Sequence, residues 1–243
     1  LIVAGDCGFG FEKKEYYEQM VRRNAKRMNQ ANNWIVFVRG NHDNPAYFDG
    51  AMFNAKRFIA VPDYSILQAC NHTILCVGGA ISIDRIYRKI NGIKENTDHL
   101  NDSQENDISR NLYWKNEAPI YDSDKLNAIR ASFMIDTVIT HTAPSHCELF
   151  SKSNLNQWAE NDSSLIEDIQ FERKTMDMLL DRLKTDNHPV TIGIMVIFIK
   201  VGIPALTEYY TRCSTLWSSV KSIDLYYFGY NIDIISKIIP DRI

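Results

Sequence analysis

The sequence predicts an α/β fold, and three observations along its first 40 residues carry that prediction. Short apolar runs at Leu1–Ala4 and Trp34–Val38 have the length of buried strands. Between them, Glu12–Gln30 places apolar side chains at helical spacing among Glu, Lys and Arg, which is typical of an amphipathic helix. This strand-helix-strand order indicates two parallel strands joined by a crossover helix.

The remaining elements continue the alternation of short strands and helices. Further strands are expected at Phe58–Val61, Ser65–Ala69, Thr73–Val77 and Ile135–Ile139. Helices are expected at Ser123–Ala131 and Ser164–Lys184. Arg85–Pro119 is polar and has no strong period, so we expect a long surface insertion with some helix.

Composition excludes several classes of protein. The 243 residues are 45% hydrophobic and 23% charged, which is ordinary for a soluble globular chain. The net charge of -3 lacks the basic excess of a phosphate-backbone binder, so there is no strong nucleic-acid signal. No apolar run reaches the roughly 18 residues of a membrane span, and no membrane partner is expected. Five Cys form a sparse, odd set, which favours reduced thiols and a cytoplasmic location.

Three polar clusters each follow a predicted strand. They are Gly5-Asp6, Gly40-Asn41-His42-Asp43 and Thr140-His141. Ligands of open α/β sheets bind beyond the carboxyl ends of the strands, so these clusters are expected at one rim of one sheet. Carboxylate, amide oxygen and imidazole suit borderline divalent metals, and glycine allows sharp turns there.

These clusters resemble the calcineurin-like metallophosphoesterases over roughly Leu1–Thr191, with Gly-Asn-His-Asp as the most specific element. The resemblance implies a layered α/β sandwich with helices flanking a mixed sheet, and two divalent metal ions (Mn, Fe, Zn or Mg) at the strand ends. Asp6 is then expected to bridge both metals, and Asn41 and His141 to bind the second one, with Asn41 also near the substrate. His42 is expected to contact the phosphate or protonate the leaving oxygen, oriented by Asp43. Two metals can activate water and stabilise both oxygens of an in-line displacement.

A fourth candidate lies after Gly78-Gly79-Ala80, where Asp84-Arg85 follows. Arg85 is a candidate for binding the phosphate of the substrate, because guanidinium suits planar oxyanions. A turn followed by a surface ion pair is an equal alternative for the same residues.

The sequence departs from the family pattern in three places. The first element, Asp-x-His, is expected upstream of Leu1, so we interpret the chain as an N-terminally truncated domain spanning residues 1–191. Phe9 stands where Gly-Asp-x-x-Asp has its second carboxylate. No Gly-His-x-His element follows His141.

The segment 192–243 differs in composition from the rest. It holds 12 Ile in 52 residues, against 17 in the preceding 191. Ile192–Lys200 can be encoded so that reading from one base earlier gives His-Trp-Tyr-Tyr-Gly-His-Phe-His-Gln, which contains the missing element. We therefore interpret this segment as an aberrant, frameshifted tail; a divergent or membrane-leaning C-terminus is the alternative.

These observations predict a phosphatase or phosphodiesterase with a two-metal site that is impaired in this chain. The alternative is a non-catalytic phosphate- or metal-binding module on the same scaffold. The substrate is expected to be a phosphoester, and protein phosphate, nucleotide and nucleic acid remain open. Substrate choice resides in loops such as Arg85–Pro119.

Overall fold

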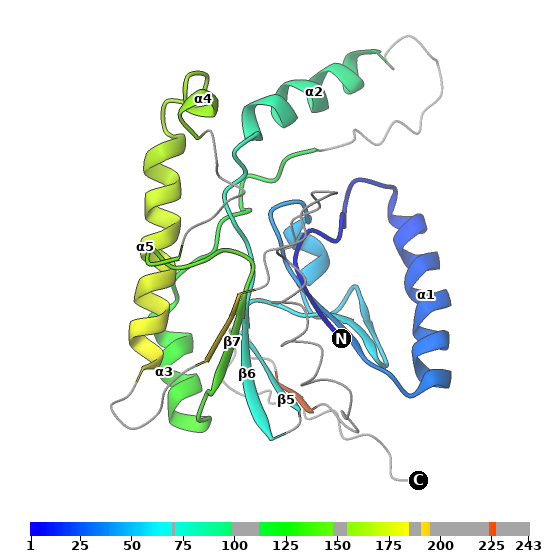
Figure 1. Ribbon diagram of the computed structural model, residues 1–243. Coiled ribbons are helices and arrows are strands. Elements are labelled where there is room, and N and C mark those ends of the chain that lie inside the picture. Colours follow the sequence, from blue (N-terminus) through cyan, green and yellow to red (C-terminus); the bar gives the residue numbers. More distant parts are fainter. Residues whose placement is uncertain (70, 99–111, 148–154, 185–190, 195–223, 227–243) are drawn as a thin grey trace, which may run out of the picture.

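The structure is a computed structural model, and it describes residues 1–69, 71–98, 112–147, 155–184, 191–194 and 224–226 (Figure 1). Two mixed sheets organise this part of the chain. The first has the order β1-β2-β4-β3, formed by Ile2–Ala4, Ile35–Val38, Phe58–Ala60 and Asn54–Ala55. The second has the order β8-β7-β6-β5-β9, formed by Thr191–Ile194, Thr137–Thr140, His72–Val77, Ser65–Ala69 and Asp224–Tyr226.

Most neighbouring strands run parallel, and this determines where the loops meet. Strand β1 pairs in parallel with β2, with Ala4 opposite Val38, so the residues that follow both strands start at the same edge. Strand β6 pairs in parallel with β7, with Val77 opposite Thr140. The predicted strand-helix-strand start is thus present, with α1 (Lys14–Ala31) as its crossover helix.

Apolar side chains from the two sheets share one core. Ile2, Val36 and Ile59 of the first sheet belong to the same buried cluster as Leu67 and Ile74 of the second. Because β-strands alternate their side chains between faces, each sheet offers one apolar face to this cluster and another to helices.

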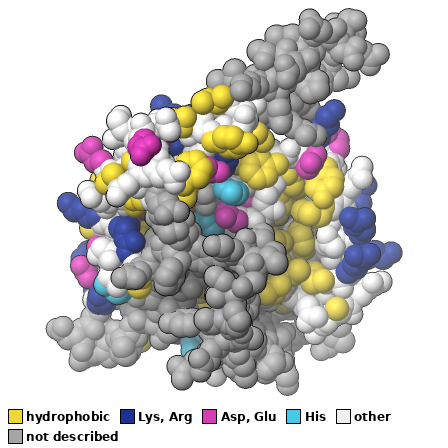
Figure 2. Space-filling model, turned by 45° about the horizontal axis from the view of Figure 1, so that its top comes forward, with side chains coloured by type: hydrophobic (Ala, Val, Ile, Leu, Met, Phe, Trp, Pro, Cys, Tyr) yellow, Lys and Arg dark blue, Asp and Glu magenta, His cyan; other side chains and the backbone are white. Residues whose placement is uncertain are grey.

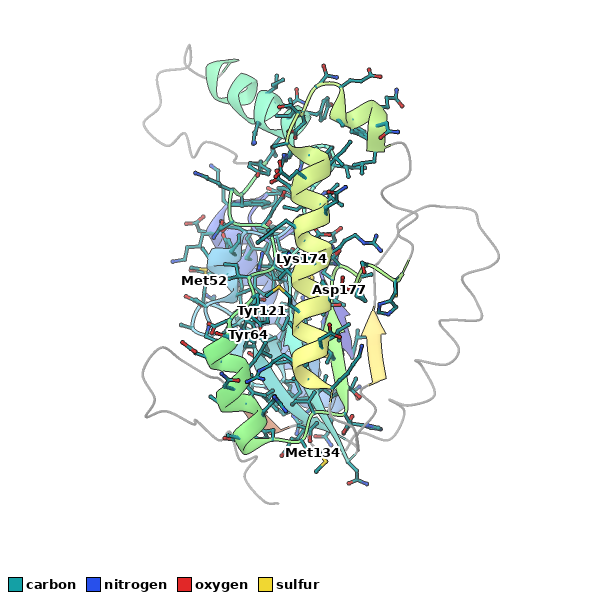
Figure 3. The ribbon with its side chains drawn as sticks, turned by 90° about the vertical axis from the view of Figure 1, so that its left-hand side faces the viewer. Met52, Tyr64, Tyr121, Met134, Lys174 and Asp177 are labelled. Atoms are coloured by element: carbon teal, nitrogen blue, oxygen red, sulfur yellow. The ribbon has the colours of Figure 1, made fainter. Side chains whose placement is uncertain are left out.

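Helices cover the other faces of the sheets. Helix α1 and the 3₁₀ helix η1 (Pro45–Phe48) join a cluster rich in aromatic rings beside the first sheet. Helices α3 (Ser123–Ser132) and α5 (Leu165–Leu183) pack with β5, β6 and β7 of the second. Figure 1 shows α1 on one side of the molecule and α3 with α5 on the opposite side. Figure 3 looks onto α5, with Tyr64 and Tyr121 beside it.

The remaining helices are α2 (Arg85–Asp98) and the short α4 (Leu155–Ala159), which contacts α5. Helix α2 occupies the first part of the segment predicted as a surface insertion. The end of that segment differs from the prediction, because Trp114 is 6% and Glu117 only 1% exposed. None of the described helices combines the length and apolar character that a membrane span needs.

The structure describes two short pieces of the predicted tail 192–243. Residues 192–194 continue β8 beside β7, and Asp224–Tyr226 form β9 beside β5. The rest of the tail lies outside the described residues, so the frameshift interpretation stays a prediction.

Candidate active site

Two glycines allow three loops to meet at the carboxyl ends of β1, β2 and β7. Gly5 has φ +101°, and a Cβ on it would lie 2.2 Å from His141 Nδ1. A Cβ on Gly40 would lie 2.3 Å from the backbone nitrogen of Asp6. A side chain at either position would push the loops apart, so close approach requires both glycines, and the positive φ requires glycine at Gly5 as well.

Asp6, Asn41 and His141 converge at this point. His141 Nε2 lies 2.9 Å from Asn41 Oδ1 and 3.2 Å from Asp6 Oδ1. The other ring nitrogen, Nδ1, lies 2.6 Å from the carbonyl oxygen of Ala4 and therefore donates a proton to it. In a neutral imidazole this leaves the Nε2 lone pair facing two oxygens, an arrangement that needs a proton or a cation between the three atoms.

The electrostatics of His141 and Asp6 agree with that need. Burial lowers the pKa of His141, but the neighbouring Asp6 carboxylate outweighs burial and raises this pKa above its usual value. Burial raises the pKa of Asp6, and the hydrogen bond and charge of His141 reverse this and lower it. Positive charge is thus favoured between Asp6 and Asn41.

His42 and Asp43 occupy separate places in the same loop. Both Asp43 oxygens accept backbone N–H groups, from Phe9 at 3.1 Å and from Gly40 at 2.8 Å. Burial raises the pKa of Asp43 despite these two hydrogen bonds. Asp43 thus ties two loops together through its oxygens, and the orientation of His42 by Asp43 stays a prediction.

His42 lies at the rim of the cluster. Its backbone nitrogen donates to Asp6 Oδ1 at 3.1 Å, and its ring lies 6.2 Å from that of Phe11. Phe11 packs in turn against Trp114 at 5.1 Å. Figure 2 shows histidine and acidic side chains together on this face, bordered by apolar side chains. The half-buried His42 ring is therefore placed beside an aromatic wall.

Arg85 does not have the geometry of the predicted substrate ligand. Its Nε and Nη2 lie 2.5 and 2.9 Å from the two oxygens of Asp162, and Nη2 lies 2.7 Å from Asp168. The hydrogen bonds that Arg85 donates to Asp162 raise the pKa of Arg85. Arg85 is 7% exposed, and this ion pair joins the start of α2 to the start of α5. Arg85 is thus bound to protein carboxylates instead of facing a phosphate.

A buried polar chain behind Asn41 was missed in the sequence. Asn41 Nδ2 donates to Ser82 Oγ at 2.8 Å, and Ser82 Oγ donates to Glu117 Oε2 at 2.6 Å. Arg88 Nη2 contacts both Ser82 Oγ and Glu117 Oε2. Burial raises the pKa of Glu117, and hydrogen bonds from Ser82 and the charge of Arg88 oppose this. The sequence signal beside it is the Gly78-Gly79 turn that precedes Ser82, and no sequence pattern pairs Ser82 with Glu117.

Helix α5 supports the same rim through Glu172. Its carboxylate accepts hydrogen bonds from the Ile81 backbone and from the Thr142 hydroxyl, the latter at 2.5 Å. Ile81 follows β6 and Thr142 follows His141, so one buried side chain, 1% exposed, holds both loops. The position of His141 thus depends on α5 as well as on β7.

The three converging atoms fit one divalent cation. Two oxygens and one imidazole nitrogen are suitable donors, and His141 already has its other nitrogen fixed by a backbone carbonyl. In the part of the chain that the structure describes, no group of three or more His, Cys, Asp or Glu side chains could hold a metal ion. The cluster has two such side chains, Asp6 and His141, and an asparagine amide.

Comparison with known proteins gives one match. The family model for calcineurin-like phosphoesterases matches residues 1–180, a span that includes all the predicted site residues. No curated protein and no solved structure matches the chain.

Proposed function

Because the chain belongs to the calcineurin-like phosphoesterase family, we propose that it is a metal-dependent phosphoester hydrolase centred on Asp6, Asn41 and His141. The observation that carries this proposal is the convergence of Asp6 Oδ1, Asn41 Oδ1 and His141 Nε2. The layered sandwich of that family is part of the proposal. The core shared by the two sheets, with helices on their other faces, supports it.

The residues of this chain have separate tasks in the proposed centre. Asp6, Asn41 and His141 would hold one divalent ion, and Asp6 would be the shared ligand if a second ion bound. When bound, such ions supply Lewis-acid stabilisation of the phosphoryl oxygens and lower the pKa of a water molecule. His42, at the rim, contacts a phosphate oxygen or gives a proton to the leaving oxygen.

Phe9 supports the reduced activity proposed for this chain. It replaces the second carboxylate of the family pattern, and its ring is 1% exposed. It lies within 6.2 Å of the rings of Tyr17, Tyr47 and Phe53. A carboxylate there would be buried among aromatic rings at a cost of several kcal/mol. This position thus favours packing over metal binding, and a non-catalytic module that binds metal or phosphate is the second candidate.

The location of this activity is also proposed. Cys7, Cys76 and Cys147, the cysteines among the described residues, are free thiols. Free thiols agree with a reducing compartment, and we propose the cytoplasm.

Hydrolysis of two aryl phosphates with Mn²⁺ tests the function. The assay uses p-nitrophenyl phosphate and bis(p-nitrophenyl) phosphate, with this chain and with a chain whose frame is restored from Ile192. Asp6→Asn should abolish Mn²⁺-dependent hydrolysis. The control is Asp49→Asn, because exposed Asp49 accepts two backbone N–H groups, from Ala51 and Met52, through a role that an amide oxygen can retain.

The outcomes separate the two candidates. Mn²⁺-dependent hydrolysis that survives Asp49→Asn and fails in Asp6→Asn supports the hydrolase. Mn²⁺ binding without hydrolysis in either chain favours the binding module. Hydrolysis that is unchanged by Asp6→Asn contradicts the proposed centre.

A further inference from the structure

We propose that Ser82 and Glu117 are positioning residues that hold the amide of Asn41 with its oxygen toward Asp6 and His141. This inference rests on the proposed metal centre, for which Asn41 is a donor. An asparagine amide can turn its oxygen or its NH₂ group toward a site, and only the oxygen can bind a cation. Whatever decides between the two orientations therefore decides whether the centre has three donors.

Two partners of Ser82 fix the direction of its hydrogen bonds, because one of them can only donate and the other can only accept. Arg88 can only donate, and Nη2 donates to Ser82 Oγ. An ionised Glu117 can only accept, and its Oε2 lies 2.6 Å from Ser82 Oγ. The single hydroxyl proton of Ser82 therefore points to Glu117, and only a lone pair remains for Asn41.

That lone pair selects the orientation of the amide. Asn41 Nδ2 lies 2.8 Å from Ser82 Oγ, and the opposite side of the amide places Oδ1 2.9 Å from His141 Nε2. The reverse orientation would set an amide oxygen against an oxygen that has no proton to offer. It would also set the NH₂ group toward the proposed cation. Arg88 and Glu117 thus determine, through Ser82, which atom of Asn41 faces the centre.

Burial makes this selection strong. Ser82 and Glu117 are each 1% exposed and Arg88 is 6% exposed. Polar networks in such low-dielectric surroundings are costly when a member lacks its partner. Glu117 is further fixed because its Oε1 accepts the Ser82 backbone N–H at 2.8 Å. The geometry of the network is thus set before any ligand binds.

The first measurement is Mn²⁺ affinity of the full chain, from the electron paramagnetic resonance signal of free Mn²⁺. Ser82→Ala should weaken binding by about tenfold or more, the usual effect of losing a partner of a metal ligand. Ser65→Ala is the matched control, because Ser65 is also 1% exposed and donates its hydroxyl at 2.6 Å to a backbone carbonyl away from Asn41. Thermal unfolding of both variants shows that they are folded.

Glu117→Gln is the second variant, and it keeps the inference testable if Ser82→Ala does not fold. Its amide can donate to Ser82 Oγ, so the hydroxyl proton is free to point to Asn41. We expect a smaller loss of Mn²⁺ affinity in the same direction. Wild-type affinity in both Ser82→Ala and Glu117→Gln would overturn the inference.

The second measurement needs no metal. In the nuclear Overhauser spectrum of the metal-free chain, the Asn41 side-chain NH₂ should be close to the β-protons of Ser82. Proximity of that NH₂ group to the Hε1 proton of His141 instead would show the reverse orientation and overturn the inference. If the wild-type chain binds no Mn²⁺, the proposed centre fails, and this spectrum alone decides on the positioning.

Discussion

Gly5 offers a direct test of how closely the loops of the candidate site approach one another. Gly5→Ala adds one methyl group to a residue at φ +101°, and that methyl would lie 2.2 Å from His141 Nδ1. Gly8 provides the matched control. It also has positive φ, +74°, yet a Cβ there would meet only Phe11 Cδ2, at an ordinary 3.7 Å.

The expected costs follow from these two environments. Alanine at positive φ costs roughly 1–2 kcal/mol, so Gly8→Ala should lose about that much stability. Gly5→Ala carries the same backbone cost and must also move His141, which is 4% exposed. Moving the ring breaks its bond to the Ala4 carbonyl and its pairing with Asp6, together worth roughly 2–4 kcal/mol. We therefore expect a total loss of about 3–6 kcal/mol for Gly5→Ala.

Urea unfolding of both variants measures the difference. The free energies of unfolding are compared at equal m-values, so that the loss reflects the native state. A Gly5 variant that loses at least about 2 kcal/mol more than the Gly8 variant fits the argument. Equal losses in the two variants would refute it, because His141 could not then lie against Gly5.

Four further outcomes are expected. The Asp6–His141 pair should stabilise the metal-free chain most between pH 3.8 and 6.5, the ordinary pKa values of the two groups. Its contribution falls as the pH rises through the raised pKa of His141 or drops through the lowered pKa of Asp6, which urea unfolding across pH can follow. Mn²⁺ affinity should rise as the pH rises through the raised pKa of His141, because the metal displaces the proton of this ring. Calorimetry at several pH values checks this. Arg85→Met should cost about 3 kcal/mol by leaving Asp162 buried without its partner, while inorganic phosphate affinity, measured by calorimetry, stays unchanged. The gene should show a one-base loss near Thr191 if the tail is frameshifted, and an intact frame there contradicts that interpretation.

The elements of this fold were predictable because their signals are local. The helix predicted at Glu12–Gln30 is α1 at Lys14–Ala31, and the strand predicted at Ser65–Ala69 is β5 with the same bounds. Apolar periodicity and turn residues need no knowledge of distant partners. Strand β7 begins two residues later than predicted, at Thr137, which pairs with Ile74 of β6. Asp136, just before it, donates its backbone N–H to the Thr73 carbonyl and accepts the Thr73 N–H with its carboxylate.

The convergence of Asp6, Asn41 and His141 was predictable for a related reason. Each follows a strand, and the parallel pairing of β1 with β2 brings Asp6 and Asn41 to one edge whatever their separation in sequence. His141 follows β7 of the second sheet, so the prediction of a single sheet was wrong, and the packing of the two sheets on a shared core brings this residue to the same place. The rule places backbone positions, however, and it does not assign hydrogen bonds. Asp43 is adjacent to His42 in sequence, and its oxygens nevertheless bind the N–H groups of Gly40 and Phe9.

Side-chain partners from distant segments explain the rest of what the sequence could not reveal. The guanidinium of Arg85 could bind a phosphate, but the chain has 30 Asp and Glu residues whose carboxylates compete for it. Asp162 does so from 77 residues away. Glu117 lies 35 residues from Ser82, in a segment without periodicity, and reaches the rim because its backbone carbonyl packs against Gly79. Tertiary neighbours decide whether an arginine is free to bind a phosphate and in which direction a serine hydroxyl donates. The residues that select the orientation of Asn41 can therefore be identified only in the folded chain.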